Sequence, residues 1–370
     1  MNGSAAVLTI DLNAIAENWR RLQAQLGAVP CGAVVKADAY GLGADRVGPV
    51  LWHAGCRTFF VALTQEAIDL RQVLPDANIH VLGGILTGDV EPLVTHQLTP
   101  VLNSLYDVEV WRKICAKHSI ALPCDLQFDT GMARLGLDRQ EIETLRANPA
   151  MLDDLNIDIV LSHLAAAEEF DHPLNHDQLM RFRSYVPLCQ ARRVSFANSA
   201  GTFFGPDFHF DLGRPGVALY GVNPTQGKPN PMAQVVSLQG KILQVRHVDR
   251  PETVGYGAHY EVRGPSRIAT VGVGYADGFL RSLSNSGFGT IGEHRVPVAG
   301  RVSMDLITLD VTAVPDSIAI PGAMVDLIGP NNTVDAVAEA AGTIGYEILT
   351  SLGQRYSRTY INDAVRGQST

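Results

Sequence analysis

A single lysine stands where it could react with a carbonyl compound. Lys36 follows the apolar run GAVV and precedes the glycine-rich segment YGLGA. An amine that is partly desolvated and close to other cations has a lowered pKa, so it becomes nucleophilic near neutral pH and can form a Schiff base. The alternative is a lysine whose aliphatic stem lies along a strand end while its amine stays in water. The residues nearby decide between the two.

Hydroxyl and glycine residues in three segments are typical of a site that binds phosphate. The segment YGLGA opens a predicted helix and includes Tyr40. ANSAG places Asn198 and Ser199 at another helix start, and RPGV places the amides of Gly216 and Val217 after a turn fixed by proline. Backbone N–H groups at such positions bind anions. Three of these segments beside one lysine predict a cofactor that carries a phosphate.

Two arginines and a histidine complete the candidate group. Arg134, in DTGMARLG, could bind a phenolate or a carboxylate with its planar guanidinium, and Arg214 could donate to a ring nitrogen. A lone histidine such as His163 is more often part of a core than a base. The three histidines of HLAAAEEFDHPLNH lack the spacing of usual zinc motifs, and a proline interrupts any helix between the second and third. We therefore predict no metal site.

The candidate residues lie at the ends of short apolar runs within residues 1–220, which we predict to be strands. Helical patterns lie between most of these runs, so the strands should be parallel and joined by right-handed crossovers. Eight such units match a (β/α)8 TIM-like barrel, whose strands direct their C-terminal ends toward one opening. A doubly wound open sheet is the alternative, but the first β–α turn lacks GxGxxG. The predicted strands are Cys31–Val35, Thr58–Ala62, Ile79–Gly83, Thr99–Leu102, Asp125–Phe128, Ile157–Ser162, Val194–Ala197 and Val217–Tyr220. The clearest predicted helices are Leu12–Leu26, Ala44–Ala54, Thr64–Leu74, Leu105–Ser119, Arg139–Ala147 and Asp177–Cys189.

The sequence pattern changes after Gly227. The stretch GKPNPM is typical of a linker, and the runs beyond it are mostly strand-like and separated by glycine and proline. We therefore expect an α/β barrel over residues 1–230 and a mostly β C-terminal domain over residues 231–370, with residues 1–10 pairing with the second domain. The predicted strands of that domain are Val235–Leu243, Arg267–Val273, Thr290–Ile291, Val296–Ala299, Ile307–Val311 and Met324–Ile328, and its clear helix is Val334–Ala341.

Composition and charge argue against several classes of protein. The 370 residues are 46% hydrophobic and 18% charged, which suffices for a large core. The net charge of -9 and the lack of a Lys/Arg run argue against a nucleic-acid partner. The five cysteines are unevenly spaced, which fits a reducing compartment. Because the N-terminus lacks a signal-peptide pattern and no apolar run is long enough to span a membrane, we expect a cytoplasmic protein with no membrane partner.

Taken together, the motifs resemble those of alanine racemases. VVKADAYGLGA resembles the segment to which pyridoxal 5′-phosphate (PLP) is attached in this family. DTGMARLG, SHLA, ANSAG, GRPGVALYG, VGYGAHY, VGVGYADGFLR and AGRVSMDLITLDV resemble further family segments in the same order, so the resemblance covers nearly the whole chain. It implies a PLP-binding barrel, a β-rich second domain and a head-to-tail homodimer with shared active sites. It also implies interconversion of L- and D-alanine, which supplies D-alanine for peptidoglycan.

The resemblance assigns roles to residues of both domains. It implies that Lys36 binds PLP and takes the proton of D-alanine, whereas Tyr256 of the partner subunit takes the proton of L-alanine on the opposite face. Tyrosine is a poor base that needs cationic neighbours, which His163 and Arg214 would supply. Arg214 would also bond the ring nitrogen, and because it keeps its charge it favours prompt return of the proton over decarboxylation or transamination. The other residues implied to bind the cofactor are Tyr40, Arg134, Asn198, Ser199, Gly216 and Val217, and those implied to contact the substrate or its entrance are Arg134, Met304, Asp305 and Tyr275.

Three positions differ from the family pattern. Gln127 stands where many members have a lysine that becomes carbamylated, Ser303 replaces a commoner cysteine, and Gln354 stands where some members have a tyrosine near the phosphate, for which Tyr356 is a candidate substitute. Three other functions remain open. They are a broad-specificity amino-acid racemase, a PLP decarboxylase of similar architecture, and a PLP-binding protein without catalytic activity. Intact Lys36 and Tyr256 argue against the last.

Overall fold

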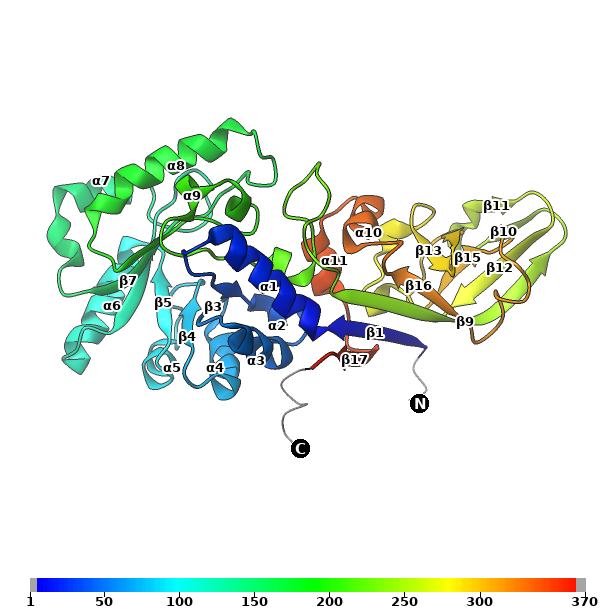
Figure 1. Ribbon diagram of the computed structural model, residues 1–370, viewed down its shortest axis with the longest axis horizontal. Coiled ribbons are helices and arrows are strands. Elements are labelled where there is room, and N and C mark those ends of the chain that lie inside the picture. Colours follow the sequence, from blue (N-terminus) through cyan, green and yellow to red (C-terminus); the bar gives the residue numbers. More distant parts are fainter. Residues whose placement is uncertain (1–4, 364–370) are drawn as a thin grey trace.

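A curled sheet of seven parallel strands forms the first part of the molecule. The computed structural model describes residues 5–363, and Figure 1 shows this sheet at one end of an elongated chain. Its strands follow the sequence order from β2 to β8, so each connection returns the chain to the start of the next strand. The predicted TIM-like barrel followed by a β-rich part is confirmed. The seven strands are β2 (Ala33–Val34), β3 (Thr58–Val61), β4 (Asn78–Val81), β5 (Thr99–Leu102), β6 (Pro123–Gln127), β7 (Asn156–Leu161) and β8 (Arg193–Ser195).

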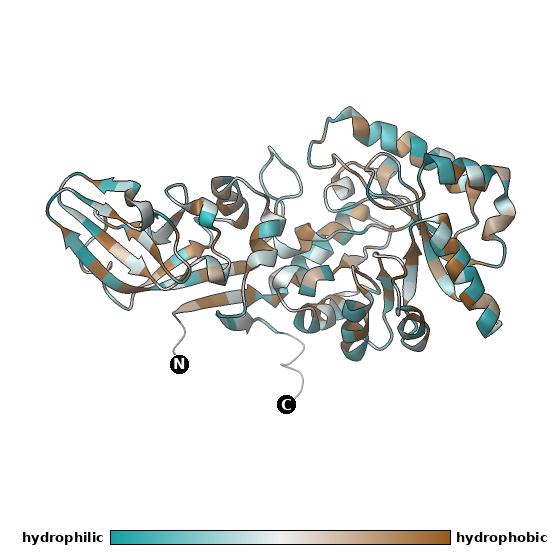
Figure 2. Cartoon of the chain, turned by 180° about the vertical axis from the view of Figure 1, so that it is seen from behind, coloured by the Kyte–Doolittle hydropathy of each residue, from teal (hydrophilic) through white to brown (hydrophobic). Residues whose placement is uncertain are grey.

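Helices cover the outside of this sheet. Figure 2 shows brown, apolar residues along the strands and teal, polar residues on the outer helices. The predicted bounds of α1, α3 and α7 match the structure, whereas α8 begins at Pro173 rather than Asp177, because proline is favoured in the first turn of a helix. The helices are α1 (Leu12–Leu26), α2 (Lys36–Gly41), α3 (Ala44–Ala54), α4 (Thr64–Val73), α5 (Val90–Thr95), α6 (Leu105–His118), α7 (Arg139–Ala147), α8 (Pro173–Tyr185) and α9 (Pro206–His209). Short 3-10 helices are η1 (Pro149–Leu152), η2 (Val186–Leu188), η3 (Gly201–Phe203) and η4 (Val217–Tyr220).

The eighth predicted strand, Val217–Tyr220, is wrong. These residues form the 3-10 helix η4. The extended residues before it close the barrel instead, since the amide of Arg214 donates to the carbonyl of Ala197 at 2.8 Å and the amide of Val34 donates to the carbonyl of Pro215 at 2.9 Å. Proline has no N–H to continue a ladder, so no regular strand forms there. The closing segment places Arg214 between the first and last strands of the barrel.

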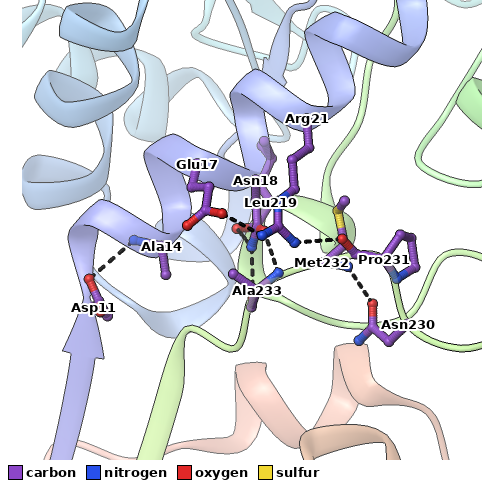
Figure 3. Close-up of polar contacts among 10 residues, drawn as sticks. All are labelled: Asp11, Ala14, Glu17, Asn18, Arg21, Leu219, Asn230, Pro231, Met232 and Ala233. Carbon is purple, nitrogen blue, oxygen red and sulfur yellow. Dashed lines mark hydrogen bonds and ion pairs between the residues drawn. The ribbon is translucent and has the colours of Figure 1, made fainter.

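Helix α1 fixes the linker between the two parts of the chain. Asp11 caps its start by accepting hydrogen bonds from two amides of the first turn. On the side of α1 that faces the linker, the Asn18 side chain donates to the carbonyl of Ala233 at 2.9 Å and accepts from its amide at 2.7 Å. Arg21 donates to the carbonyl of Pro231 at 2.7 Å. Figure 3 shows these contacts, which hold the proline-rich stretch against the barrel.

The second part is built on an eight-stranded sheet. Its order is β14-β13-β16-β9-β1-β17, with β12 paired to β9 and to β15. The N-terminal strand β1 belongs to this sheet, because it pairs antiparallel with β9 and parallel with β17. The helices α10 and α11 lie between this sheet and the barrel, and the ribbon β10-β11 lies at the far end of the molecule (Figure 1). A boundary at residue 230 stays a prediction.

The elements of this part have the following bounds. The strands are β1 (Ala6–Asp11), β9 (Val236–Val248), β10 (Glu252–Val254), β11 (Tyr260–Val262), β12 (Ser266–Val271), β13 (Phe288–Ile291), β14 (His294–Pro297), β15 (Ile307–Asp310), β16 (Met324–Ile328) and β17 (Ser357–Ile361). The helices are η5 (Tyr256–Ala258), η6 (Tyr275–Asp277), η7 (Arg281–Leu283), α10 (Val334–Ala341, as predicted) and α11 (Gly345–Ser351). None of the helices within residues 5–363 is long and apolar enough to cross a membrane.

Candidate active site

Lys36 lies at the mouth of the barrel, two residues after the end of β2. Burial lowers the pKa of its amine, Arg134 lowers it further, and Glu66 acts in the opposite direction. Two backbone bonds hold the Glu66 carboxylate beside it, since Oε1 accepts from the amide of Ala37 at 2.6 Å and Oε2 from the amide of Ala62 at 2.8 Å. The amine therefore loses its proton more readily than an exposed lysine, as a nucleophile or base requires.

The four residues after Lys36 form a left-handed turn. Ala37, Asp38, Ala39 and Tyr40 have φ of 52°, 54°, 53° and 56°. For a residue other than glycine, the left-handed conformation raises the free energy by about 1–2 kcal/mol. Such strain persists only where surrounding contacts determine it, and it concentrates at functional sites. No sequence signal indicated this turn.

The turn brings Tyr40 against the candidate phosphate-binding segments. A Cβ at Gly216 would lie 2.3 Å from the Tyr40 hydroxyl, so only glycine fits there. Ser199 Oγ accepts from the amide of Gly216 at 2.9 Å, and Val217 follows directly at the start of η4. Asn198 Oδ1 accepts from an amide of the neighbouring turn at 2.9 Å, so this side chain orders the loop. Two hydroxyls and backbone amides around a required glycine fit a phosphate group.

Arg214 is a buried cation held by neutral groups. Its side chain donates to Ser195 Oγ at 2.5 Å and to the carbonyl of Ser162 at 2.6 Å. Burial lowers its pKa to about 10, and Asp125 partly opposes this. The guanidinium therefore stays charged at neutral pH. Within residues 5–363 it forms no ion pair with a carboxylate, so its charge is available to an anionic or electron-rich ligand.

The pKa of His163 shows that the mouth residues lie close together. Burial, Arg214, Arg134 and Lys36, in that order, lower this pKa to about 3. The imidazole is therefore neutral at physiological pH. The expectation that His163 supplies positive charge to the Tyr256 hydroxyl is wrong, because burial and the neighbouring cations keep its proton off, and Arg214 is the group that keeps a charge. The structure brings Lys36, Arg134, His163 and Arg214 together, as the sequence predicted for residues at strand ends.

The candidates of the second part form a separate group. Tyr256 is the first residue of η5 and its surface is 70% exposed, on the β10-β11 ribbon at the end of the chain farthest from the barrel (Figure 1). Tyr275 and Met304 are joined through their backbones, since the next amide after Tyr275 donates to the carbonyl of Met304 at 3.0 Å. Arg355 donates to Asp305 at 2.8 Å. No hydrogen bond or ion pair in the described part of the chain joins Tyr256 to Lys36.

Comparison with known proteins supports one family for both halves. Models of the alanine racemase N-terminal and C-terminal domains match residues 10–224 and 235–360. The chain is 51% identical to the alanine racemase of Rhodospirillum rubrum, with 96% of each chain covered. The chain belongs to the alanine racemase family. It is also 46% identical to a catabolic alanine racemase of Mesorhizobium japonicum, covering 97% of this chain and 94% of the relative.

A solved alanine racemase has the same fold along its whole length. The alanine racemase of Bartonella henselae, a structure with covalently bound PLP, matches with a TM-score of 0.93 at 43% identity. The match covers 97% of this chain and 100% of that one. The spacing of the motifs therefore reflects a common architecture for the barrel and the β-rich part.

Gln127, which departs from the common pattern of alanine racemases, supports the loop that carries Arg134. Its amide donates to the carbonyl of Leu135 at 3.0 Å. Asp129 fixes the same loop, because its two oxygens accept from three consecutive amides at 2.8–2.9 Å. The neutral amide of Gln127 and the carboxylate of Asp129 thus hold this loop together.

The other two departures lie in the second part. The Ser303 carbonyl accepts from the amide of Tyr275 at 3.0 Å, so this residue contributes its backbone. Gln354 is exposed. Tyr356 is buried, burial raises the pKa of its hydroxyl, and no residue described by the structure bonds that hydroxyl. A phosphate role for Tyr356 stays a prediction.

Sequence reasoning missed several residues that shape the mouth. Glu66 lies a few residues after the end of β3, where the rule for strand ends could have found it. The residues around Arg214, Ser162 and Ser195, carry no sequence signal, because neutral partners of a buried cation have no fixed spacing. Tyr346 of α11 also reaches the site, with its ring centroid 6.0 Å from that of Tyr40.

Proposed function

We propose that this chain uses PLP to interconvert L- and D-alanine. The barrel mouth carries the proposal, because there the Lys36 amine has a lowered pKa beside Arg134, a neutral His163 and the buried cation Arg214. The relatives named as alanine racemases and the PLP of the B. henselae enzyme support the same function. When bound, PLP withdraws electrons from the amino acid and so stabilises negative charge at its Cα.

The residues of the mouth divide the binding of PLP among them. Lys36 would hold its aldehyde carbon, Arg134 its phenolate side and Arg214 its ring nitrogen. Arg214 keeps its own proton because its pKa stays near 10, so it offers a hydrogen bond and not a proton. A ring nitrogen that is hydrogen-bonded but not protonated favours return of the α-proton over decarboxylation, the reaction of the alternative PLP decarboxylase. The phosphate would bind Tyr40, Asn198, Ser199, Gly216 and Val217.

Racemisation requires proton transfer on two opposite faces of the substrate Cα. We assign the face of D-alanine to the Lys36 amine and the face of L-alanine to the Tyr256 hydroxyl. Tyr256 is exposed and lies between β10 and β11, whereas Lys36 begins α2. Because the β10-β11 ribbon lies at the far end of the molecule from α2 (Figure 1), a second copy supplies Tyr256 in a head-to-tail homodimer. His163 and Arg214 would lie beside that hydroxyl, where the charge of Arg214 favours its deprotonated form.

The same second copy would bring the remaining substrate contacts. Met304 and Tyr275 are 54% and 41% exposed, which leaves them available to a partner. The Met304 amide would bind the substrate carboxylate together with Arg134, and Tyr275 and Asp305 would line the entrance. The hydrogen bond from Arg355 holds Asp305 in place for this role.

The first experiment tests the covalent site. The purified chain should show the absorbance of lysine-bound PLP and should racemise L-alanine in a chiral assay. Lys36→Ala should lose both, and borohydride should fix the cofactor to Lys36 in the wild-type chain but not in the variant. A colourless wild-type chain that borohydride leaves unmodified would falsify the proposal.

The second experiment tests the assignment of faces. Tyr256→Phe should suppress exchange of the L-alanine α-proton with solvent while the D-alanine α-proton still exchanges at Lys36. Equal loss of both exchanges would contradict the assignment.

The third experiment tests whether two copies share the site. Lys36→Ala and Tyr256→Phe chains are each inactive alone, but mixed dimers contain one intact site. Random exchange of subunits should therefore restore about a quarter of the wild-type activity. No recovery after verified subunit exchange would place both bases in one chain.

Substrate breadth and biological role complete the proposal. We propose a preference for alanine over larger amino acids and a supply of D-alanine for peptidoglycan. L-Serine, lysine or arginine turned over as fast as L-alanine would favour the broad-specificity alternative. Rescue of a D-alanine auxotroph by this gene product would support the biosynthetic role. Growth on D-alanine that depends on it, without such rescue, would favour the catabolic role named for the M. japonicum relative.

A further inference from the structure

The strained turn after Lys36 is held from outside the barrel. At the start of the turn, the Glu66 carboxylate accepts from the amide of Ala37 at 2.6 Å. Within the turn, the Asp38 carboxylate accepts from the amide of Ala44, the first residue of α3, at 2.7 Å. Among the described residues, no group of the barrel bonds the carbonyl of Gly41 at the end of the turn. Strained backbone relaxes unless its surroundings determine it, so this end needs its own restraint.

That restraint comes from the last strand of the second part. Arg358, on β17, donates from Nη1 to the carbonyl of Gly41 at 2.7 Å. Its Nη2 donates to the carbonyls of Leu352 and Gly353, both at 3.1 Å. One guanidinium thus bonds the end of the turn in the barrel and the end of α11 in the second part. A Cβ at Gly41 would lie 2.8 Å from the carbonyl of Leu349, so α11 also packs directly on the turn.

The geometry points to Arg358 as a positioning residue for the cofactor-binding turn. Within residues 5–363 its side chain forms no hydrogen bond or ion pair with the mouth residues or with the candidate substrate contacts. It acts through the backbone of Gly41, the neighbour of Tyr40, and so it holds the Tyr40 hydroxyl against Gly216. This inference rests on the proposed function, because it assumes that Lys36 and Tyr40 bind PLP.

The chemistry of arginine suits this position. A planar guanidinium directs several donors along fixed lines and can bond carbonyls of two segments at once. A lysine offers one ammonium on a flexible stem and cannot reproduce both directions. Arg358→Lys should therefore keep the positive charge and part of the packing but lose the link between the two segments. Arg358→Gln should lose both the charge and the link.

Arg267 provides a matched control. It is a buried arginine on β12 that also bonds several backbone carbonyls, including that of Val314 at 2.6 Å and that of Ala319 at 3.3 Å. These contacts lie within the second part. Arg267→Gln should thus lower stability without reaching the turn.

The experiment measures PLP affinity and backbone opening in full-length variants stripped of cofactor. We expect Arg358→Gln to raise the equilibrium dissociation constant for PLP by about tenfold or more, and Arg358→Lys by less, since a hydrogen bond from a charged donor is lost. Amide hydrogen exchange at residues 37–44 should accelerate in the same variants. Arg358→Gln should weaken the binding of pyridoxal, which lacks the phosphate, by a smaller factor than the binding of PLP. Arg267→Gln should change the dissociation constant by less than about twofold at a comparable loss of thermal midpoint.

The outcomes separate this inference from the proposed function. Equal PLP affinities of the Arg358 and Arg267 variants at matched stability would overturn the inference, as would unchanged exchange at residues 37–44. If Arg358→Gln does not fold, Arg358→Lys carries the same comparison. A wild-type chain that does not bind PLP, or a Lys36→Ala variant that binds it as tightly, would instead overturn the proposed function.

Discussion

The two ends of the barrel differ in how their charged side chains are paired. At the mouth, Lys36, Arg134 and Arg214 form no ion pair within the described residues, and burial together with these three cations keeps His163 neutral. At the floor, the end of the barrel beneath them, two carboxylates each have a close partner. His80 lies 2.6 Å from Asp125, and Arg193 lies 2.5 Å from Asp158.

The difference separates function from stability. An unpaired buried cation destabilises a chain by itself, so it is retained where a ligand compensates its charge. A paired buried group is costly to break but contributes little chemistry. Because the C-terminal ends of barrel strands carry the active site and the N-terminal ends carry stability, substitutions at the two ends should have opposite signatures.

Removal of the charge at the mouth should give the largest effect. Arg214→Gln keeps a donor for Ser162 or Ser195 but removes the cation. Racemase activity should fall by about 10²–10³-fold, the usual loss when a preorganised electrostatic contact is removed. The free energy of unfolding of the cofactor-free chain should stay the same or rise, because an unpaired buried charge is gone. Steady-state kinetics and denaturant unfolding at one protein concentration measure the two effects.

Removal of a charge at the floor should give the reverse pattern. Asp125 offers one carboxylate oxygen to His80 at 2.6 Å and the other to the amide of Ile159 at 3.0 Å. Asp125→Asn replaces one of these oxygens by an amino group, so it cannot accept from both partners. The free energy of unfolding should fall by about 3 kcal/mol, as for other broken buried pairs. Activity per folded molecule should change by less than about threefold. A loss of activity like that of Arg214→Gln would show that the floor takes part in the chemistry.

Several residues of the barrel mouth were predictable from the sequence because the order of parallel strands brings them together, whatever their separation along the chain. Lys36 and His163 follow the strands β2 and β7, and parallel strands bring their C-terminal ends to one opening. The bounds of α1 and α10 were predictable to the residue because their caps are local. Asp11 and Thr333 accept hydrogen bonds from amides of the first turn of each helix, and Gly27 and Gly342 follow its last residue.

The left-handed turn and the closing segment could not be predicted from local pattern. KADAY has no glycine, so propensity gives no hint that four residues adopt positive φ. Their conformation depends on Arg358 and α11, which are distant in sequence. The apolar run Val217–Tyr220 resembled a strand, but Pro215 and Gly216 before it end the ladder and start η4 instead. In both places tertiary contacts decide the backbone.

Because His163 stays neutral in the folded chain, the free energy of unfolding should depend on pH. The folded-state pKa of His163 is about 3, whereas an unfolded histidine titrates near its usual value of about 6.5. Between these values the unfolded chain binds a proton that the folded chain refuses, so the free energy of unfolding falls as the pH falls. His163→Asn removes this term. From pH 6.5 to pH 5 the cofactor-free variant should gain about 1–2 kcal/mol relative to the wild type. A difference that does not vary with pH would mean that folding does not change the pKa of His163.

The smallest effect should come from the outer pair of the floor. The side chains of Arg193 and Asp158 are 25% and 19% exposed, so water screens their attraction more than that of the buried pair above them. Arg193→Met keeps the aliphatic packing and removes the charge, and it should lower the free energy of unfolding by no more than about 1 kcal/mol. The double variant with Asp158→Asn measures their coupling directly. A coupling as large as the loss in Asp125→Asn would mean that the floor is one buried network, whereas a small one confirms that burial, and not the number of ion pairs, sets the contribution of each charge.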